Sequence, residues 1–140
     1  MRATVELRDD CEGVDWVALK RALSADDFDN GRTPRQLELA FRASAAVVFA
    51  REGGAIVGKG RALSDGVCNA YVVDLWTRSD RRRRGIGRRM LERLIAPLAG
   101  QHVFLFTDDA AEFYAACGFA RRGVGFERVV GRWLDNASSR

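Results

Sequence analysis

The sequence has few cysteines and histidines and no long apolar run. Its three cysteines are an odd number without a Cys-x-x-Cys pair, and it has one histidine. These shortages argue against a disulfide framework and a zinc centre, so no metal is predicted. No stretch approaches the roughly 20 consecutive apolar residues that a membrane-spanning helix needs. Because residues 1–10 carry alternating charges and lack the apolar core of a signal peptide, we expect a cytoplasmic protein with no membrane partner.

Lysine is also scarce, because Lys20 and Lys59 are the two lysines among 23 basic residues. A preference for arginine fits phosphate binding, but it also follows from GC-rich coding, so the net charge of +4 decides little. The length of 140 residues, with 47% apolar and 30% charged residues, is that of one globular domain. We expect this domain to cover residues 1–134 and to leave a frayed tail at 135–140.

The most informative stretch is the arginine- and glycine-rich run at residues 80–89, Asp-Arg-Arg-Arg-Arg-Gly-Ile-Gly-Arg-Arg. Residues 70–77 before it are rich in β-branched and aromatic side chains, which predicts a strand. After it, apolar residues recur at helical spacing over 86–98, and the apolar run 103–106 predicts a buried strand. A strand–turn–helix–strand unit normally pairs its strands in parallel and leaves the turn at their carboxyl ends.

Such a turn presents unpaired backbone N–H groups at the positive end of a helix, which is a natural site for phosphate. Gly85 and Gly87 allow tight bending and the close approach of a ligand. The positive charge is reinforced by Arg82, Arg83, Arg84, Arg88 and Arg89. Two better-known phosphate loops are excluded, because no Gly-x-x-x-x-Gly-Lys-Ser/Thr run occurs and Met90 stands where a dinucleotide fingerprint needs its third glycine.

The pattern Arg82-x-x-Gly85-x-Gly87 resembles the Arg/Gln-x-x-Gly-x-Gly/Ala signature of the GNAT (GCN5-related N-acetyltransferase) family. Residues 113–119, Phe-Tyr-Ala-Ala-Cys-Gly-Phe, resemble that family's Phe/Leu-Tyr-x-x-x-Gly-Phe element and lie at the expected distance. The resemblance covers residues 69–122 firmly and the flanking regions more loosely. A solvated basic face or a nucleic-acid patch would explain the arginines but not the two glycines and Tyr114, so nucleic acid is not an expected partner.

The resemblance implies an α/β (α+β) fold, with a mixed but mostly antiparallel twisted sheet of six to seven strands flanked by about four helices. It also implies acetyl-CoA as co-substrate, with the pyrophosphate on the amides of the turn and the pantetheine arm along residues 75–77. One backbone N–H of that strand would polarise the thioester carbonyl. The implied cofactor-binding residues are Leu75, Trp76, Thr77, Arg82, Arg83, Arg84, Gly85, Ile86, Gly87, Arg88, Thr107 and Phe113. Many relatives carry an asparagine where Thr107 stands, so a contact to the arm is either replaced by its hydroxyl or lost.

Tyr114 is the residue that the resemblance indicates as the acid that protonates the departing thiolate. A phenol of pKa about 10 can protonate a thiolate of pKa about 8.5 only with help from geometry and local charge. The alternative is a packing residue whose hydroxyl binds a backbone carbonyl. Asp108 or Asp109 is expected to cap the helix that carries Tyr114, and Gly118 to end it in a left-handed conformation.

Asp74 is the nearest carboxylate to the predicted site and is therefore the candidate base for the acceptor amine. By strand alternation it shares a face with Val72 and Trp76, although a bulge typical of the family would change this. Some relatives keep a glutamate base where Val72 stands, and a valine cannot act. A chain of water molecules is thus the alternative to a side-chain base.

The polar stretch 24–33 separates two predicted helices, at Asp15–Leu23 and from Pro34 to about Ala43. In the family this loop forms one wall of the acceptor pocket, so Asp27, Phe28 and Asp29 are the predicted substrate-binding residues for a cationic amine with an apolar body. The alternative is a solvated capping loop. Thr33 is expected to cap the second helix, with Pro34 at its first position.

The other predicted elements are strands joined by turns. Alternation predicts an edge strand at Thr4–Arg8, and Glu52-Gly53-Gly54 predicts a hairpin turn between two further strands. A closing hairpin is expected near Gly123 and Gly125. The strands predicted by these signals lie at Ala45–Arg51, Ala55–Leu63, 102–107, Phe119–Arg122 and Phe126–Val130.

Two classes of function are consistent with the sequence. The first is an N-acetyltransferase that moves the acetyl group of acetyl-CoA to an amine of a small molecule or peptide, as a monomer or a homodimer. The second is a non-catalytic module that binds acyl-CoA or nucleic acid through the basic turn. Tyr114 and the acidic loop favour the enzyme.

Overall fold

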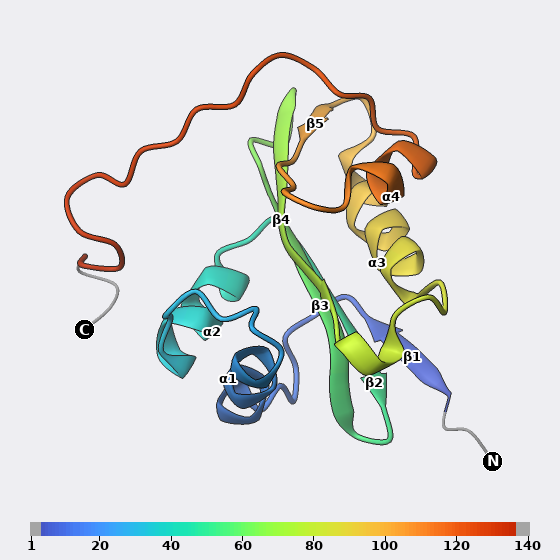
Figure 1. Ribbon diagram of the computed structural model, residues 1–140, viewed down its shortest axis with the longest axis vertical. Helices are drawn as coiled ribbons and strands as arrows, with labels where there is room; N and C mark the ends of the chain where they lie inside the picture. The colour runs from blue at the N-terminus through green and yellow to red at the C-terminus, as the bar shows by residue number, and fades with distance from the viewer. Residues whose placement is uncertain (1–3, 137–140) are drawn as a thin grey trace.

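The computed structural model describes residues 4–136 and contains one five-stranded sheet in the order β1-β2-β3-β4-β5 (Figure 1). The first four strands pair antiparallel, and β5 joins β4 in parallel. The strands are β1 (Val5–Arg8), β2 (Ala46–Glu52), β3 (Ala55–Ser64), β4 (Asn69–Thr77) and β5 (His102–Phe104). The mixed α/β class is therefore confirmed, whereas the expected count of six to seven strands is too high for the described residues.

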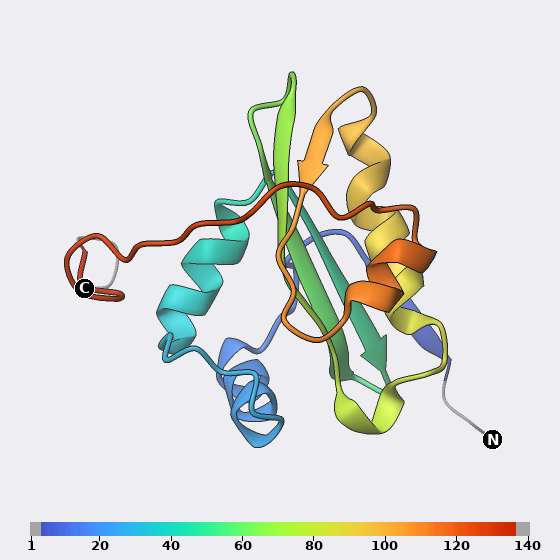
Figure 2. The same cartoon turned by 45° about the horizontal axis from the view of Figure 1, so that its top comes forward.

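Helices cover both faces of the sheet, with α1 and α2 on one face and α3 and α4 on the other (Figures 1 and 2). The hydrophobic core is likewise divided into two clusters, one on each face of the sheet. One packs between the sheet and helices α1 and α2, and the other packs between the sheet and α3. The helices are α1 (Trp16–Ala25), α2 (Pro34–Arg42), α3 (Ile86–Ile95) and α4 (Ala111–Ala116), with short 3-10 turns η1 (Ser79–Arg81) and η2 (Ala96–Leu98).

The caps of α2 follow the sequence prediction. The Thr33 hydroxyl accepts a hydrogen bond from the backbone N–H of Gln36, and the Gln36 side chain accepts one from the backbone N–H of Thr33. Pro34 occupies the first turn, where its missing N–H costs nothing. Gly118 ends α4 with φ +94, also as predicted. The predicted cap at the start of α4 is wrong, because the N-cap is Ala110 and no side chain caps the helix. The Thr107 hydroxyl accepts a hydrogen bond from the backbone N–H of Ala110, just before the helix.

The middle of β3 is built for close packing against α3. A Cβ added at Gly58 would lie 2.8 Å from the Met90 side chain, and one added at Gly60 would lie 2.9 Å from Leu94. Glycine at these two positions therefore lets α3 settle close to the sheet. The intervening residue, Lys59, points to the opposite face of the sheet and lies against the α1–α2 side.

A bulge interrupts β4 opposite Gly60. The pairing register shifts there, and Asp74 adopts the left-handed conformation with φ +64. As a result Val72 packs in the α3-side cluster, while Trp76 packs in the α1/α2-side cluster. The simple alternation that places Val72 on the face of Asp74 and Trp76 is therefore wrong, because the extra residue reverses the side-chain pattern.

The parallel strands β4 and β5 separate soon after they meet. Their ladder ends at the pair Tyr71–Phe104, although β4 continues to Thr77. Over residues 72–77 the β5-facing edge of β4 has no strand partner in the described part of the chain. Its backbone N–H and C=O groups are thus available to a ligand that binds as an added strand.

The predicted closing hairpin is wrong. Residues 119–132 form no strand, and they cross the sheet from the α4 side to the α2 side (Figure 2). The chain passes so close over the Phe106 ring that a Cβ at Gly125 would overlap it. Further along, Trp133 donates a 2.8 Å hydrogen bond from Nε1 to the Asn30 carbonyl. Gly123 and Gly125 indicated a hairpin, but they could not indicate the path that the chain takes across the sheet.

The ends of the chain add little to this architecture. Residues 135 and 136 have no regular structure, and the rest of the predicted tail, 137–140, lies outside the described residues, as do 1–3. None of the helices in residues 4–136 is long and apolar enough to cross a membrane. Within the same residues, no group of three or more histidine, cysteine and acidic side chains is arranged to hold a metal ion.

Candidate active site

The arginine- and glycine-rich turn connects β4 to α3, as the sequence predicts. Gly85 is the N-cap of α3 with φ +78, and having no side chain it leaves the first N–H groups of the helix uncapped. Arg83 also adopts a positive φ of 65°. The turn is exposed from Arg82 to Gly85, so those donors and the positive end of α3 face solvent.

Ion pairs and hydrogen bonds fix the turn to the body of the protein. Arg81 forms an ion pair with Glu52 of β2, and Nε of Arg82 donates a 3.1 Å hydrogen bond to the Thr77 carbonyl. Asp26, after α1, accepts 2.9 Å hydrogen bonds from Trp76 Nε1 and from the backbone N–H of Ser79. The turn is therefore held in place by contacts to β2, to β4 and to the residue that follows α1.

Asp26 is a functional support that the sequence did not indicate. Burial alone would raise the pKa of its carboxyl group, but the hydrogen bonds from Ser79 and Trp76 lower the pKa overall. Arg82 lies 3.6 Å away and adds a weaker attraction. Asp26 thus stays ionised at neutral pH and ties the end of β4 to the α1–α2 loop.

Three of the predicted cofactor-binding residues meet at the start of α3. A Cβ built on Gly87 would lie 3.4 Å from Thr77 Oγ1 and 3.5 Å from Phe113 Cζ. The end of β4, the first turn of α3 and the first turn of α4 therefore converge on one small volume. Leu75 and Phe113 both pack against the α3-side core, whereas Trp76 packs on the opposite face of the sheet.

Tyr114 lies in α4 between two aromatic neighbours. Its ring makes edge contacts with Phe113 and Phe119, with ring centroids 5.0 and 6.0 Å apart. Burial raises the pKa of the phenol above its usual value, and the charges of Cys117 and Asp109 raise it further. In the described part of the chain its hydroxyl makes no hydrogen bond, so the carbonyl contact expected of a purely packing tyrosine is not formed.

Tyr114 and Thr107 both line a pocket of about 540 Å³. Its walls come from the residues that follow β5, from α4 and from the segment 119–125. The Thr107 hydroxyl already accepts the Ala110 N–H, but it retains a hydrogen to donate. The predicted contact of Thr107 to a ligand thus remains geometrically open as a donor contact.

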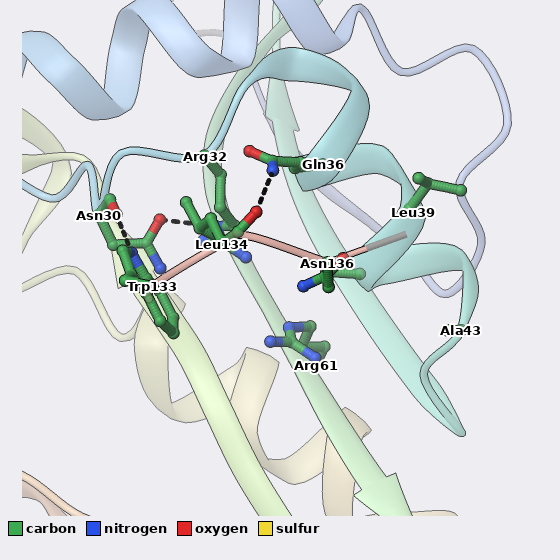
Figure 3. A pocket seen from close by; sticks show the side chains of 10 residues that line it. Asn30, Arg32, Gln36, Leu39, Ala43, Arg61, Trp133, Leu134 and Asn136 are labelled. Atoms are coloured by element: carbon green, nitrogen blue, oxygen red, sulfur yellow. Dashed lines mark hydrogen bonds between the residues drawn. The ribbon is translucent and has the colours of Figure 1, made fainter. Parts of the chain in front are cut away.

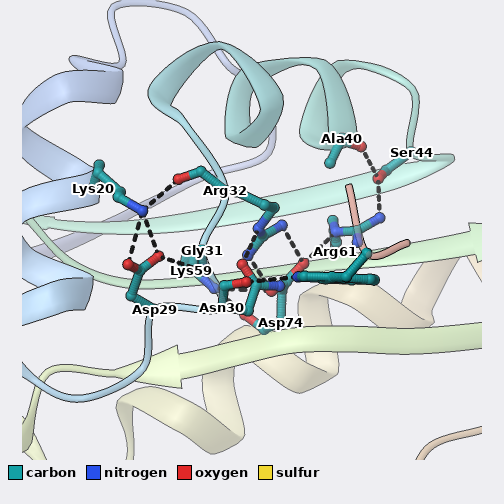
Figure 4. Close-up of polar contacts among 11 residues, drawn as sticks. Lys20, Asp29, Asn30, Gly31, Arg32, Ala40, Ser44, Lys59, Arg61 and Asp74 are labelled. Carbon is teal, nitrogen blue, oxygen red and sulfur yellow. Dashed lines mark hydrogen bonds and ion pairs between the residues drawn. The ribbon is translucent and has the colours of Figure 1, made fainter. Parts of the chain in front are cut away.

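Asp74 lies on the opposite side of the sheet from Tyr114 and is surrounded by cations (Figure 4). Its carboxylate accepts hydrogen bonds of 2.7 and 3.1 Å from the two terminal nitrogens of Arg32 and one from Arg61 Nε. Burial alone would raise its pKa, but the charge of Lys59 and the hydrogen bonds and charge of Arg32 hold the pKa far below its usual range. Such a carboxylate is ionised but weakly basic, which disfavours Asp74 as the general base.

Lys59 is fully buried behind Asp74. Its Nζ donates a 2.8 Å hydrogen bond to the Asp74 carbonyl and lies 4.9 Å from the centroid of the Phe28 ring. Burial lowers the pKa of Lys59 to about 8, opposed by the attraction of Asp74 and assisted by repulsion from Arg32. The single carboxylate of Asp74 is thus surrounded by three cations. We call these four residues, Arg32, Lys59, Arg61 and Asp74, the buried charge cluster.

The loop predicted to bind a cationic amine uses its acidic groups differently. Both oxygens of Asp29 lie 2.7 Å from Nζ of Lys20, so its charge is already neutralised. Asp27 is exposed with φ +55, and Phe28 covers Lys59. The loop instead contributes a cation to the site, because Arg32 turns inward from it (Figure 4).

A second pocket, of about 360 Å³, opens onto the buried charge cluster (Figure 3). Arg32 and Arg61 line it together with Gln36 and the apolar side of α2. The C-terminal segment passes across it, held by a 3.3 Å hydrogen bond from Gln36 Nε2 to the Leu134 carbonyl. The walls of this pocket therefore come from three parts of the chain that are distant in sequence, residues 30–43, Arg61 and residues 133–136.

One signal in the sequence could have indicated the cluster. Lys59 and Arg61 are two residues apart in an otherwise small and apolar strand, so both must point to the same buried face. Two cations on a buried face require an anionic partner. The identity of the other members could not be read, because Arg32 and Asp74 are 42 positions apart.

Comparisons with known proteins agree with this geometry. A family profile described as an acetyltransferase (GNAT) domain matches residues 43–121. A curated relative, GCN5-related N-acetyltransferase 3, chloroplastic, from Arabidopsis thaliana, is 32% identical over 84 residues, which are 57% of this chain and 35% of that protein. This chain thus spans about a third of the length of that relative.

Solved structures share the fold over most of the chain. A crystal structure from Deinococcus radiodurans R1 is similar with a TM-score of 0.76 and 28% identity, covering 89% of this chain and 87% of that one. A GNAT family acetyltransferase from Streptococcus pneumoniae TIGR4 is similar with a TM-score of 0.75 and 23% identity, covering 92% and 100%. The latter likeness is one of fold.

Proposed function

The chain belongs to the GNAT acetyltransferase family, and we propose that it transfers the acetyl group of acetyl-CoA to an amine of a small molecule or peptide. The observation that carries this proposal is the meeting of the unpaired edge of β4 with the glycine turn at the start of α3. An extended arm and a pyrophosphate can be held together only where such an edge and such a helix start adjoin.

The residues of the turn would hold the donor. The uncapped N–H groups of α3 bind phosphate oxygens, and the small volume at Gly87 lets them approach the backbone. Residues 75–77 offer their backbone groups to the arm, with the bulge at Asp74 directing one N–H toward the thioester carbonyl. The exposed arginines add an attraction that weakens with salt.

In the transfer step the amine nitrogen bonds to the carbonyl carbon and the carbon–sulfur bond breaks. The departing thiolate takes one proton, which we assign to the Tyr114 hydroxyl, and the new amide nitrogen loses one proton. Because Asp74 is engaged by two arginines, we assign that second proton to water and give Asp74 the role of holding Arg32 and Arg61. Bulk solvent then restores the phenol.

The test of the proposal is acetyl-CoA binding by calorimetry together with CoA release over a panel of amines. Tyr114→Phe should lower kcat by roughly 10²- to 10⁴-fold, because it removes a positioned acid. The KM for acetyl-CoA should stay nearly constant, since the lost interaction belongs to the transition state. The raised phenol pKa keeps Tyr114 protonated through neutral pH, so any alkaline limb that it causes lies above pH 10 and disappears in the variant.

The matched control is Tyr71→Phe at the other tyrosine of the chain, whose ring contacts Phe106 on a different element. It should leave kcat unchanged. An equal loss in both variants, or none in Tyr114→Phe, would remove Tyr114 from the mechanism. Binding of acetyl-CoA without CoA release from any amine would favour the non-catalytic acyl-CoA module instead.

A further inference from the structure

Resting on the proposed acetyl transfer, we propose that the acceptor amine also carries an oxyanion group, a carboxylate or a phosphate ester, which binds between Arg32 and Arg61 in the pocket beside α2. This differs from the cationic acceptor that the acidic loop suggests in the sequence. Asp29 of that loop is paired with Lys20, whereas the pocket wall carries Arg32 and Arg61.

The buried charge cluster has an excess of positive charge. Three cationic side chains, exposed by 7% at Arg32, 0% at Lys59 and 15% at Arg61, surround the single carboxylate of Asp74. Deprotonation of Lys59 would not balance the cluster, because the two arginines cannot lose their protons. Buried charges without a counter-ion are costly, so a cluster of this composition is suited to receive an anion.

Both arginines keep hydrogen-bond donors for a ligand. In the described part of the chain, Arg32 uses three of the five N–H donors of a guanidinium, toward Asp74 and Asn30. Arg61 uses two, toward Asp74 and, at 3.4 Å, Ser44. Asp74 holds the two guanidinium groups side by side, so the remaining donors can bind a planar or tetrahedral oxyanion without rearrangement.

The pocket places this anion close to the proposed reaction. Asp74, which contacts both arginines, is the bulged residue of β4, and Leu75 next to it begins the stretch proposed for the pantetheine arm. A short molecule can therefore anchor an oxyanion on the arginines and extend its amine toward the bulge. The volume of about 360 Å³ suits a small metabolite, and the apolar side of α2 with Leu134 suits its hydrocarbon part.

The experiment uses hexanoate, hexyl phosphate and hexanol as probes of equal chain length, titrated into the full chain by calorimetry without acetyl-CoA. At least one of the two anions should bind saturably and at least tenfold more tightly than hexanol, and the comparison of the two identifies carboxylate or phosphate. Arg61→Gln should weaken that binding by about 10- to 100-fold, the worth of charge-assisted hydrogen bonds. Arg35→Gln, an exposed arginine of α2 paired with Glu38, is the control and should bind like the parent.

Arg61→Lys is a second variant, to be used if Arg61→Gln does not fold. It keeps a cation beside Asp74 but removes the planar guanidinium group. It should fold and still bind the anion more weakly than the parent. Equal affinity for hexanol and for both anions, or parental affinity in the Arg61 variants, overturns the inference.

A transfer assay separates this inference from the proposed function. With acetyl-CoA present, 6-aminohexanoate or 6-aminohexyl phosphate should release CoA faster than 1,6-diaminohexane. The reverse order overturns the anionic acceptor while acetyl transfer stands. If acetyl-CoA neither binds nor reacts, the proposed function fails, and the calorimetry on the three probes still decides whether the pocket binds an anion.

Discussion

The two groups of arginines in this protein differ in almost every physical respect. Those of the turn, from Arg82 to Arg89, are consecutive or nearly so and face solvent at the start of α3. Arg32 and Arg61 come from different elements, are nearly buried and share the carboxylate of Asp74. The first group belongs to the proposed donor side of the site, and the second belongs to the proposed acceptor side.

The difference shows how location determines the strength of a charge. In solvent an ion pair contributes little, because water and salt screen it, so the turn arginines act together and each is individually replaceable. In the buried cluster the same side chain interacts strongly, and removing a partner leaves a charge uncompensated. Substitutions in the cluster should therefore affect folding, and substitutions in the turn should affect ligand binding.

The largest effect is expected from Asp74→Asn. Asparagine tolerates the left-handed conformation at φ +64 and preserves the shape, but it leaves three cations without their carboxylate. We expect a loss of roughly 3–5 kcal/mol in the free energy of unfolding, measured by urea denaturation at pH 7. Asp80→Asn is the control, because water and salt screen its exposed pairs with Arg78 and Arg81 and these pairs contribute little to stability.

The pH dependence of stability should differ between the parent and Asp74→Asn. The folded-state pKa of Asp74 is depressed, so its stabilisation is fully present above the unfolded value of about 3.9 and is lost as pH falls toward the folded value. The parent should lose stability on acidification below about pH 5, and Asp74→Asn should lose much less. Parallel acid profiles of parent and variant would contradict the role given to Asp74.

Lys59 should produce the next largest effect, at alkaline pH. Its folded-state pKa of about 8 lies below the unfolded value of 10.5, so between these values the unfolded chain binds more protons and stability rises with pH. Relative to Lys59→Met, the parent should gain about 3 kcal/mol between pH 8 and 10.5. Urea denaturation of both proteins across this pH range measures the difference between their free energies of unfolding. Other groups that titrate at alkaline pH are present in both proteins, so their contributions cancel in this difference. A constant difference would show that the pKa of Lys59 is not lowered in the folded state.

Gly87→Val should have a smaller effect on folding and a clear one on binding. A Cβ fits at 3.4–3.5 Å from Thr77 and Phe113, but the two added methyl groups occupy the volume proposed for the phosphates. We expect acetyl-CoA affinity to fall by about 10- to 100-fold, the loss of one to two charged hydrogen bonds. Calorimetry measures the affinity, and an unchanged far-UV circular dichroism spectrum shows that the fold survives. Parental affinity would mean that the donor binds elsewhere.

The smallest effect is expected from single arginines of the turn. Arg84→Gln should change the free energy of unfolding by less than about 0.5 kcal/mol, because its side chain is exposed. Its acetyl-CoA affinity should fall only a few fold, and the dependence of affinity on salt should become shallower. Arg35→Gln, an exposed arginine of α2 paired with Glu38, is the control and should keep the parental salt dependence. A loss larger than that of Gly87→Val would place Arg84 in a direct contact.

Much of the donor side could be predicted from the sequence because its signals are local. Gly85 and Gly87 lie within a few residues of the strand and helix that they join, and the periodicity of α3 marks its buried face. The cap at Thr33 and the left-handed end at Gly118 were likewise predicted from adjacent residues. Local signals suffice here because turns, caps and helix faces depend on neighbours in the chain.

The failures came from features that depend on distant partners. The bulge that reverses the faces of Val72 and Asp74 depends on how β4 fits β3, and alternation alone cannot show an extra residue. The closing hairpin was predicted around Gly123 and Gly125, but whether the flanking residues pair with the sheet depends on the path that the chain takes after α4. The role of Asp74 changed for the same reason, since its basicity depends on which cations surround it.

The sequence by itself determined the crossover, the phosphate-type turn and the placement of Tyr114 on the following helix, because each is encoded in residues that are close along the chain. Only the tertiary structure brought Arg32, from the loop before α2, to Arg61 on β3 and Asp74 on β4. That cluster arises from packing between segments that are distant in sequence, where burial removes the screening by water. Because water does not screen the excess positive charge of the buried cluster, the cluster attracts an anion more strongly than the same side chains would in solvent.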